Sequence, residues 1–106
     1  MKTAIFIGNS RECIRGFPDT VRQEIGLQIF RIQQGLDPED WKPMKTVGAG
    51  VREIRIHTGD EYRTLYVANI GHAVYILHAF QKKTQKTSKK DIDLARKRYK
   101  QIGGLR

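Results

Sequence analysis

Cationic, phenolic and imidazole side chains gather in the second half of the sequence, on and beside segments that alternate like β-strands. The set comprises Arg55, His57, Tyr62, Arg63, Tyr66, His78, Phe80, Lys82 and Lys83. A neighbouring 2′-hydroxyl can cleave an RNA backbone if cations stabilise the negative charge that gathers at phosphorus and one group moves a proton. Aromatic rings can hold splayed bases by stacking. These residue types therefore fit phosphodiester chemistry.

The same residues also fit ordinary structural roles. Tyr66 and Phe80 can be core residues, His78 a hydrogen-bonded strand histidine, and Arg55 an exposed position on a strand. Other chemistries have less support, because the sequence has no Cys/His spacing typical of a metal site, no glycine-rich phosphate loop before a helix and no nucleophile elbow. We expect neither a metal nor a nucleotide cofactor, and we interpret the single cysteine, Cys13, as a helix packing residue.

Positive charge is concentrated in the last quarter of the chain. The 106 residues carry 20 Lys plus Arg against 11 Asp plus Glu, for a net charge of +9. Residues 82–106 hold ten of the basic and only two of the acidic side chains, whereas the rest is nearly balanced. Such asymmetry favours a polyanionic partner, either nucleic acid or an acidic protein segment, over a small neutral substrate. A solubilising helix face is an equally good explanation of charge alone.

Length and patterning predict a single domain of residues 1–106. The expected elements are a strand at 3–7, a helical turn capped by Asn9 and Ser10, a helix from Asp19 closed by Gly35, strands at 51–58, 61–69 and 73–81, and a basic helix opened by a Ser88–Asp91 capping box and ending before Gly103. Residues 37–50 are predicted to form a long loop that Trp41 anchors to the core.

The longest purely apolar stretch, residues 73–77, is too short to span a membrane, and no signal peptide is evident. We therefore expect a cytoplasmic protein.

The pairing of the central hairpin depends on its turn. A two-residue turn at Gly59-Asp60 would place Ile56 opposite Arg63 and would give Arg55 the same face as Tyr66. A turn that is one residue longer would shift the pairing, so the sequence leaves the face of Arg63 open. In the following strand, simple alternation puts Phe80 on the face of Ile76 and predicts a central strand that is apolar on both sides.

Four segments resemble the phage-derived branch of the RelE/HigB toxin family, within the RelE/ParE superfamily. They are residues 51–56 (VREIRI), 62–66 (YRTLY), 77–87 (LHAFQKKTQKT) and 91–96 (DIDLAR). The F-x-K-K-T-x-K-T run is the most specific part, and the likeness covers nearly the whole chain. One departure is Ser88, where related sequences often have proline. The resemblance implies an α+β fold. We expect a small antiparallel sheet of three to four strands, with two N-terminal helices on one face and a basic C-terminal helix.

The resemblance also implies a function and a set of site residues. The protein would be the toxin of a type II toxin–antitoxin pair, a metal-independent mRNA endoribonuclease that acts on translating ribosomes. Arg63 would contact the scissile phosphate, and Lys82 and Lys83 would bind the backbone or stabilise the transition state. The residue that moves the proton varies in the family, and the candidates here are His57, His78 and Tyr66. The expected RNA-binding residues are Arg55, Phe80, Lys86, Lys89 and Lys90.

Two alternatives come from other classes of protein. The same superfamily architecture supports non-catalytic toxins of the ParE type, which inhibit DNA gyrase, because a fold does not determine a function. The chain can also be an inactive phage-derived protein that only binds an antitoxin. The partners we expect are mRNA, the ribosome and a cognate antitoxin, a small helix-turn-helix protein encoded by the neighbouring gene, with no membrane partner.

Overall fold

The computed structural model describes residues 1–105, and side chains through residue 103. The elements follow the chain as β1 (Thr3–Phe6), α1 (Ser10–Arg15), α2 (Asp19–Gln33), β2 (Trp41–Pro43), β3 (Val51–His57), β4 (Glu61–Val67), β5 (Ala73–Lys82) and α3 (Lys89–Leu105). The strands form one sheet in the order β1-β5-β4-β3-β2. β1 is parallel to β5 and all other neighbours are antiparallel. The fold is therefore α+β, with five strands rather than the expected three to four.

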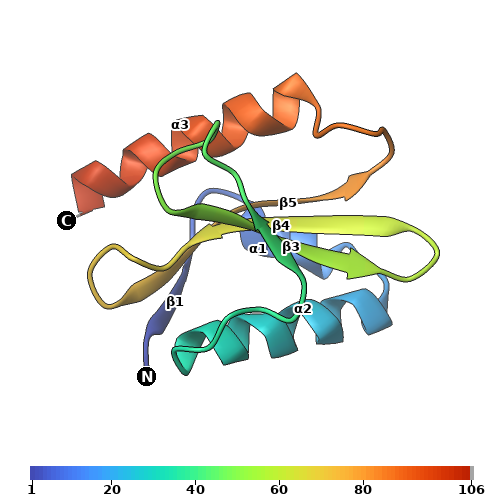
Figure 1. Ribbon diagram of the computed structural model, residues 1–106, viewed down its shortest axis with the longest axis horizontal. Helices are drawn as coiled ribbons and strands as arrows, with labels where there is room; N and C mark the ends of the chain where they lie inside the picture. Colours follow the sequence, from blue (N-terminus) through green and yellow to red (C-terminus); the bar gives the residue numbers. More distant parts are fainter. Residues whose placement is uncertain (106) are drawn as a thin grey trace.

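The sheet separates two helical layers. α2 lies along one face with α1 beside it, and α3 crosses the other face (Figure 1). Each face has its own apolar core. The predicted stripe of α2, which includes Val21 and Ile25, is buried against one face, and the stripe of α3, which includes Ala95 and Ile102, is buried against the other. Within residues 1–105, no helix is long and apolar enough to cross a membrane.

The strand that the sequence did not predict, β2, is a short pairing at one edge of the sheet. Residues 41–43 pair with β3, so Trp41 belongs to a strand instead of anchoring a loop. The ring of Trp41 packs under the guanidinium of Arg52, whose Cζ lies 3.8 Å from the ring centroid. Three residues with a proline at the end carry too little alternation to predict a strand, and β1 becomes part of the sheet only through a parallel pairing with the distant β5.

The β3–β4 turn contains three residues, 58–60, because His57 pairs with Glu61. Arg55 therefore lies directly opposite Arg63, and the two arginines share a face of the sheet. The two-residue alternative, which grouped Arg55 with Tyr66, is wrong. Tyr66 packs instead in the core beneath α2.

A register shift in β5 changes the face of its last residues. Leu65 pairs with His78, but Tyr66 pairs with Ile76, so Leu77 is an extra residue opposite β4. Such a bulge breaks the simple alternation of side chains. Phe80 consequently packs in the core beneath α3, with Leu77, and not on the face of Ile76 as predicted.

The two predicted helix starts behave differently. Ser88 Oγ accepts a hydrogen bond from the backbone N–H of Asp91 (3.2 Å), which confirms Ser88 as the cap of α3. Asn9 and Ser10 do not cap α1. The side-chain Oδ1 of Asn9 accepts a hydrogen bond from the Arg98 guanidinium, and the Ser10 hydroxyl donates to the backbone carbonyl of Ile76. These two side chains join α1 to α3 and β5, while α3 continues through Gly103 to Leu105.

Candidate functional site

Three rows of side chains run across β3, β4 and β5 on the face that also carries α3. The rows are His57–Glu61–Lys82, Arg55–Arg63–Phe80 and Glu53–Leu65–His78. This end of the face lies beyond the first turn of α3 and beside the connector of residues 83–88. The bulge in β5 is required for this arrangement, because it turns Phe80 and His78 toward the same face as Arg63.

A depression of 480 Å³ opens at this end of the sheet. Its lining comes from both hairpin strands, the end of β5 and the connector: Arg55, Glu61, Arg63, Lys82, Lys83, Thr84 and Gln85. The structure thus brings the four predicted phosphate-binding cations to one place, although they come from three segments of the chain.

Arg63 is almost completely buried at the floor of the depression. Its side chain is 3 % exposed. Nη2 donates to Oε1 of Glu61 (2.9 Å), Nη1 donates to the carbonyl of Tyr62 (2.9 Å), and Nε lies 3.4 Å from Oε1 of Glu53. The guanidinium is therefore held by carboxylates of the chain itself, and only its edge borders the open space.

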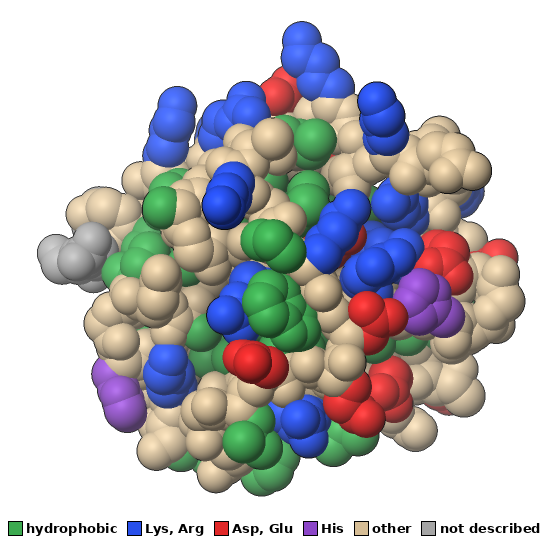
Figure 2. Space-filling model, viewed as in Figure 1, with side chains coloured by type: hydrophobic (Ala, Val, Ile, Leu, Met, Phe, Trp, Pro, Cys, Tyr) green, Lys and Arg blue, Asp and Glu red, His purple; other side chains and the backbone are tan. Residues whose placement is uncertain are grey.

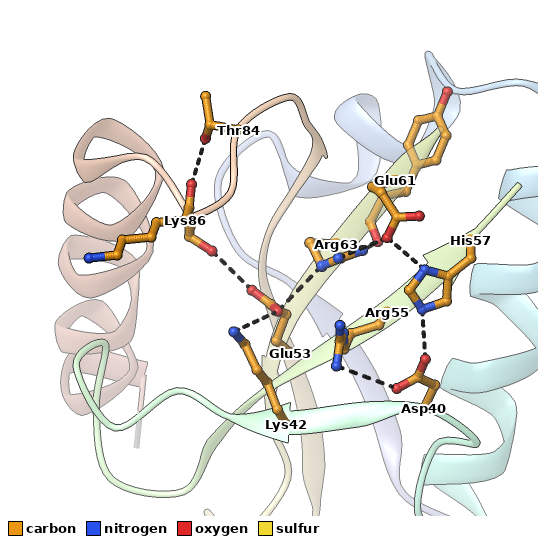
Figure 3. A network of polar contacts seen from close by, with 11 residues as sticks. Asp40, Lys42, Glu53, Arg55, His57, Glu61, Arg63, Thr84 and Lys86 are labelled. Carbon is orange, nitrogen blue, oxygen red and sulfur yellow. Dashed lines mark hydrogen bonds and ion pairs between the residues drawn. The ribbon is translucent and has the colours of Figure 1, made fainter. Parts of the chain in front are cut away.

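Glu53 is a fully buried carboxylate behind Arg63. Its side chain is 0 % exposed and lies 3.9 Å from the ammonium of Lys42, and Oε2 accepts a hydrogen bond from the hydroxyl of Thr87 (3.2 Å). An ionised group at this depth is stable only when it is paired. Glu53 therefore fixes the position of Arg63 and also fastens the connector to β3 (Figure 3).

His57 lies between two carboxylates beside the depression, which it does not itself line. Nδ1 is 2.6 Å from Glu61 and Nε2 is 2.7 Å from Asp40. Both ring nitrogens must carry a proton to donate to both oxygens, which favours the imidazolium. The hydrogen bond to Glu61 and, to a smaller extent, the hydrogen bond to Asp40 raise the pKa of His57. The hydrogen bond between His57 and Glu61 also lowers the pKa of Glu61. No group of three or more His, Cys, Asp or Glu residues within 1–105 is arranged to hold a metal ion.

The polar network nearly balances its own charge. Figure 3 traces it from Lys42 through Glu53, Arg63, Glu61 and His57 to Asp40, whose other oxygen is 4.0 Å from Arg55. Three permanent cations, Lys42, Arg55 and Arg63, thus face three carboxylates. The excess positive charge at the depression comes from the end of β5 and from the connector.

Lys82 and Lys83 supply that excess charge. Neither forms an ion pair within the described part of the chain. Partial burial, followed by the neighbouring Arg63, Lys42 and Arg55, lowers the pKa of Lys82. Lys83, Lys86, Lys89 and Lys90 are exposed, and Figure 2 shows the blue Lys and Arg side chains around the connector and α3, whereas the red acidic ones lie mostly below them. A polyanion would meet this positive rim first.

The other predicted site residues do not line the depression. Tyr66 lies on the opposite face of the sheet and is 1 % exposed, and burial raises its pKa. His78 is 6 % exposed and donates from Nε2 to Asp91 (2.7 Å), and burial lowers its pKa. Phe80 is 9 % exposed and stacks on His78, with ring centroids 5.2 Å apart. Tyr66 therefore lies on the face opposite Arg63, whereas His78 and Phe80 share the face of Arg63 but are buried there.

Two carboxylates of the site, Glu53 and Glu61, are not among the residues predicted from the sequence. Neither is a cation, the residue type that suits a bound phosphate. One signal was present: Glu53 alternates with Arg55 and His57 along one strand. A carboxylate in such a row predicts an ion pair with the facing strand.

One comparison places the chain in a family. The family described as "Phage derived protein Gp49-like (DUF891)" matches residues 12–100. A search of curated proteins found no match. The family match spans well over half of the chain and includes every residue of the depression. The protein therefore belongs to the phage-derived Gp49-like family, which is in general a RelE-like toxin family.

Proposed function

We propose that this protein is the toxin of a type II toxin–antitoxin system and a metal-independent endoribonuclease that cuts mRNA on the ribosome. Family membership supports the toxin assignment. The observation that carries the nuclease assignment is the meeting of Arg55, Arg63, Lys82 and Lys83 around one open depression. A bound phosphodiester there would lie among four cations, of which Arg63 is held in position by Glu53 and Glu61, and such cations can stabilise a developing negative charge.

The reaction we propose is attack of the RNA 2′-oxygen on the adjacent phosphorus. The 2′-oxygen–phosphorus bond forms as the bond to the 5′-oxygen breaks, which leaves a 2′,3′-cyclic phosphate and a 5′-hydroxyl. Of the three proton-transfer candidates, His57 fits best, because it is half exposed and its hydrogen bonds to Glu61 and Asp40 raise its pKa, which favours the protonated form. Glu61 takes the proton of the 2′-hydroxyl, and His57 gives a proton to the 5′-oxygen. Their 2.6 Å contact then returns the proton from Glu61 to His57.

The test is cleavage of a defined mRNA by purified protein, with and without translating ribosomes. New 5′ ends mapped by primer extension are expected for the unaltered protein. Arg63→Ala and His57→Gln should each lower the cleavage rate by at least about a hundredfold, the usual weight of one charge-stabilising or proton-transfer group. Arg52→Ala is the matched control, because Arg52 lies on β3 outside the depression and pairs with Asp37. Absence of new ends with either substrate would refute the nuclease assignment.

The burial of Arg63 favours one alternative, a non-catalytic toxin of the ParE type. A guanidinium that is 3 % exposed and already bound by two carboxylates resembles a structural ion pair. Such a toxin would stop growth without cutting RNA and would inhibit supercoiling by purified gyrase. If induced expression caused no growth arrest at all, the chain would be an inactive antitoxin-binding protein.

The proposed function requires a cognate antitoxin. We propose a small helix-turn-helix protein, encoded by the adjacent gene, with an acidic segment that covers the positive surface of residues 82–103 and displaces RNA. Mixing the two purified proteins on a native gel should shift both bands. No shift at micromolar concentration would exclude this partner.

A further inference from the structure

A second hollow lies on the other side of the sheet, between α1 and α2. It measures 330 Å³ and has an apolar floor made by Phe6, Ile14, Ile25, Gly26 and Ile29. Arg11, Arg15 and Arg22 stand around it, with Gln23. Because the depression of the candidate site is on the α3 face, this groove is separated from it by the sheet. Neither the nuclease proposal nor the proposed antitoxin contact at residues 82–103 uses it.

The exposed apolar side chains of the described structure gather around α2. Leu27 and Phe30 on α2 are 50 % and 52 % exposed, Leu36 just after the helix is 53 % exposed, and Met1 touches Gln34 through its sulfur. Phe30 is one turn beyond Gly26, so it extends the floor of the groove along the helix. Scattered exposed apolar residues need no explanation, but an apolar groove that an exposed phenylalanine continues is typical of a binding surface.

The charge of the rim indicates the kind of partner. Arg11 and Arg15 form no ion pair with any residue that the structure describes, and the Arg11 guanidinium lies 5.8 Å from the centroid of Phe6, at the edge of the floor. Only Arg22 is paired, with Asp19. Two copies of this groove would bring arginines together, so charge disfavours a symmetric dimer through it.

We propose that the α1–α2 groove binds an amphipathic helix that places apolar side chains on the floor and acidic side chains beside Arg11 and Arg15. A helix is the occupant that suits a groove between two helices. The segment of α2 from Arg22 to Phe30 is about 12 Å long at 1.5 Å per residue, which accepts two turns of a partner helix. The groove and the RNA-facing depression can be occupied at the same time.

The probe is a synthetic, end-capped 18-residue peptide with leucines at helical spacing i, i+3, i+4 and i+7 and glutamates beside them. A second peptide has lysine in place of each glutamate. We expect the acidic peptide to bind the whole protein in a fluorescence anisotropy titration and the basic one to bind at least about tenfold more weakly, a difference of about 1.4 kcal/mol. Amide chemical shift changes should fall on α1 and α2.

Gly26→Leu tests the floor without harming the fold. A side-chain carbon at Gly26 would meet nothing within 4 Å, and leucine is a better helix former than glycine. The variant should bind the acidic peptide at least about tenfold more weakly than the unaltered protein. Gly103→Leu is the matched control, because Gly103 is also a helical glycine with open space around it, on α3, and it should bind like the unaltered protein. Arg11→Glu/Arg15→Glu should reverse the preference between the two peptides.

Several results would overturn the proposal. In the peptide experiments, these are equal affinity for the acidic and basic peptides, chemical shift changes on α3 instead of α1 and α2, or unchanged peptide binding by Gly26→Leu. A protein dimer that Gly26→Leu dissociates would also contradict the proposal. So would binding of anionic phosphatidylserine vesicles together with no binding of the acidic peptide. RNA cleavage is the independent readout. Gly26→Leu should leave it unchanged, whereas Arg63→Ala removes it if the proposed function is right, so the two proposals fail separately.

Discussion

The guanidinium of Arg63 already binds an anion, since Nη2 lies 2.9 Å from Oε1 of Glu61. Glu61 is more than one-third exposed and Arg63 is only 3 % exposed. The carboxylate therefore occupies the solvent side of the arginine, where a phosphodiester would have to approach. Any RNA that contacts Arg63 must first displace Glu61 or share the guanidinium with it.

Glu61→Gln should separate RNA binding from RNA cleavage. Removal of the negative charge should strengthen binding of a non-cleavable 2′-deoxy RNA analogue several-fold, because a competitor of the phosphate is lost. The cleavage rate of bound RNA should fall, because the proposed proton acceptor is lost. Filter binding and single-turnover kinetics measure the two effects. Asp60→Asn, in the adjacent exposed turn, is the control, and equal changes in both variants would show that only net charge matters.

Glu53→Ala should destabilise the protein by about 1–3 kcal/mol, the usual cost of leaving a buried polar group without its partner. The group that loses its partner is Nε of Arg63, which lies 3.4 Å from Oε1 of Glu53, whereas Nη2 keeps its hydrogen bond to Glu61. Urea unfolding followed by circular dichroism gives the free energy of unfolding. Glu53→Leu/Arg63→Met should recover much of the loss, because an apolar pair of similar volume leaves no charge uncompensated. A single variant as stable as the double one would contradict this account.

The two histidines of the α3 face should give the stability opposite dependences on pH. The raised pKa of His57 means that its contribution is complete below the unfolded value of 6.5 and is lost as pH rises through the folded pKa. The lowered pKa of His78 means that stability is lost as pH falls below 6.5, because the unfolded chain then binds the proton more readily. Between pH 5 and 8, the free energy of unfolding that His57→Gln loses relative to the unaltered protein should therefore be larger at low pH. The loss for His78→Gln should be larger at high pH. Parallel profiles would show that one of the two directions is wrong.

Lys82→Ala/Lys83→Ala should weaken RNA binding and reduce its salt dependence. These two lysines carry the positive charge that the carboxylates of the depression do not balance. If each meets one phosphate, the slope of log K against log salt should become shallower by about 1.4, since one contact to a single strand contributes about 0.7. Lys97→Ala/Lys100→Ala, on the exposed side of α3, is the matched control. An unchanged slope for the first pair would exclude them from the RNA contact.

Local patterns predicted much of the fold. The spacing of Val21, Ile25, Ile29 and Ile32 determines which side of α2 is buried, and the Ser88 hydroxyl defines the start of α3. Features that depend on distant partners could not be predicted in the same way. The pairing of β1 with β5 has no local signal, and the bulge at Leu77 shows itself only when β5 is aligned with β4.

The sequence predicted the cations of the candidate site but not its carboxylates. Residue types and family resemblance selected Arg55, Arg63, Lys82 and Lys83, which the structure brings together. The same reasoning could not give the burial of Arg63, because burial depends on the three-residue turn that sets Arg63 opposite Arg55 and next to Glu53. Tyr66 was misplaced for the same reason, since a change of one residue in register moves a side chain to the other face.

Asp91 bonds to a strand residue and to its own helix cap, because its two oxygens accept hydrogen bonds from His78 (2.7 Å) and Ser88 (2.6 Å). The segment between Lys82 and Lys89 is therefore held at both ends, at β5 through His78 and at the first turn of α3 through Ser88. Insertions or exchanges within that tether would redirect its ammonium groups and leave both anchors intact. The positive charge beside Arg63 can therefore be repositioned without a change in the sheet or in α3.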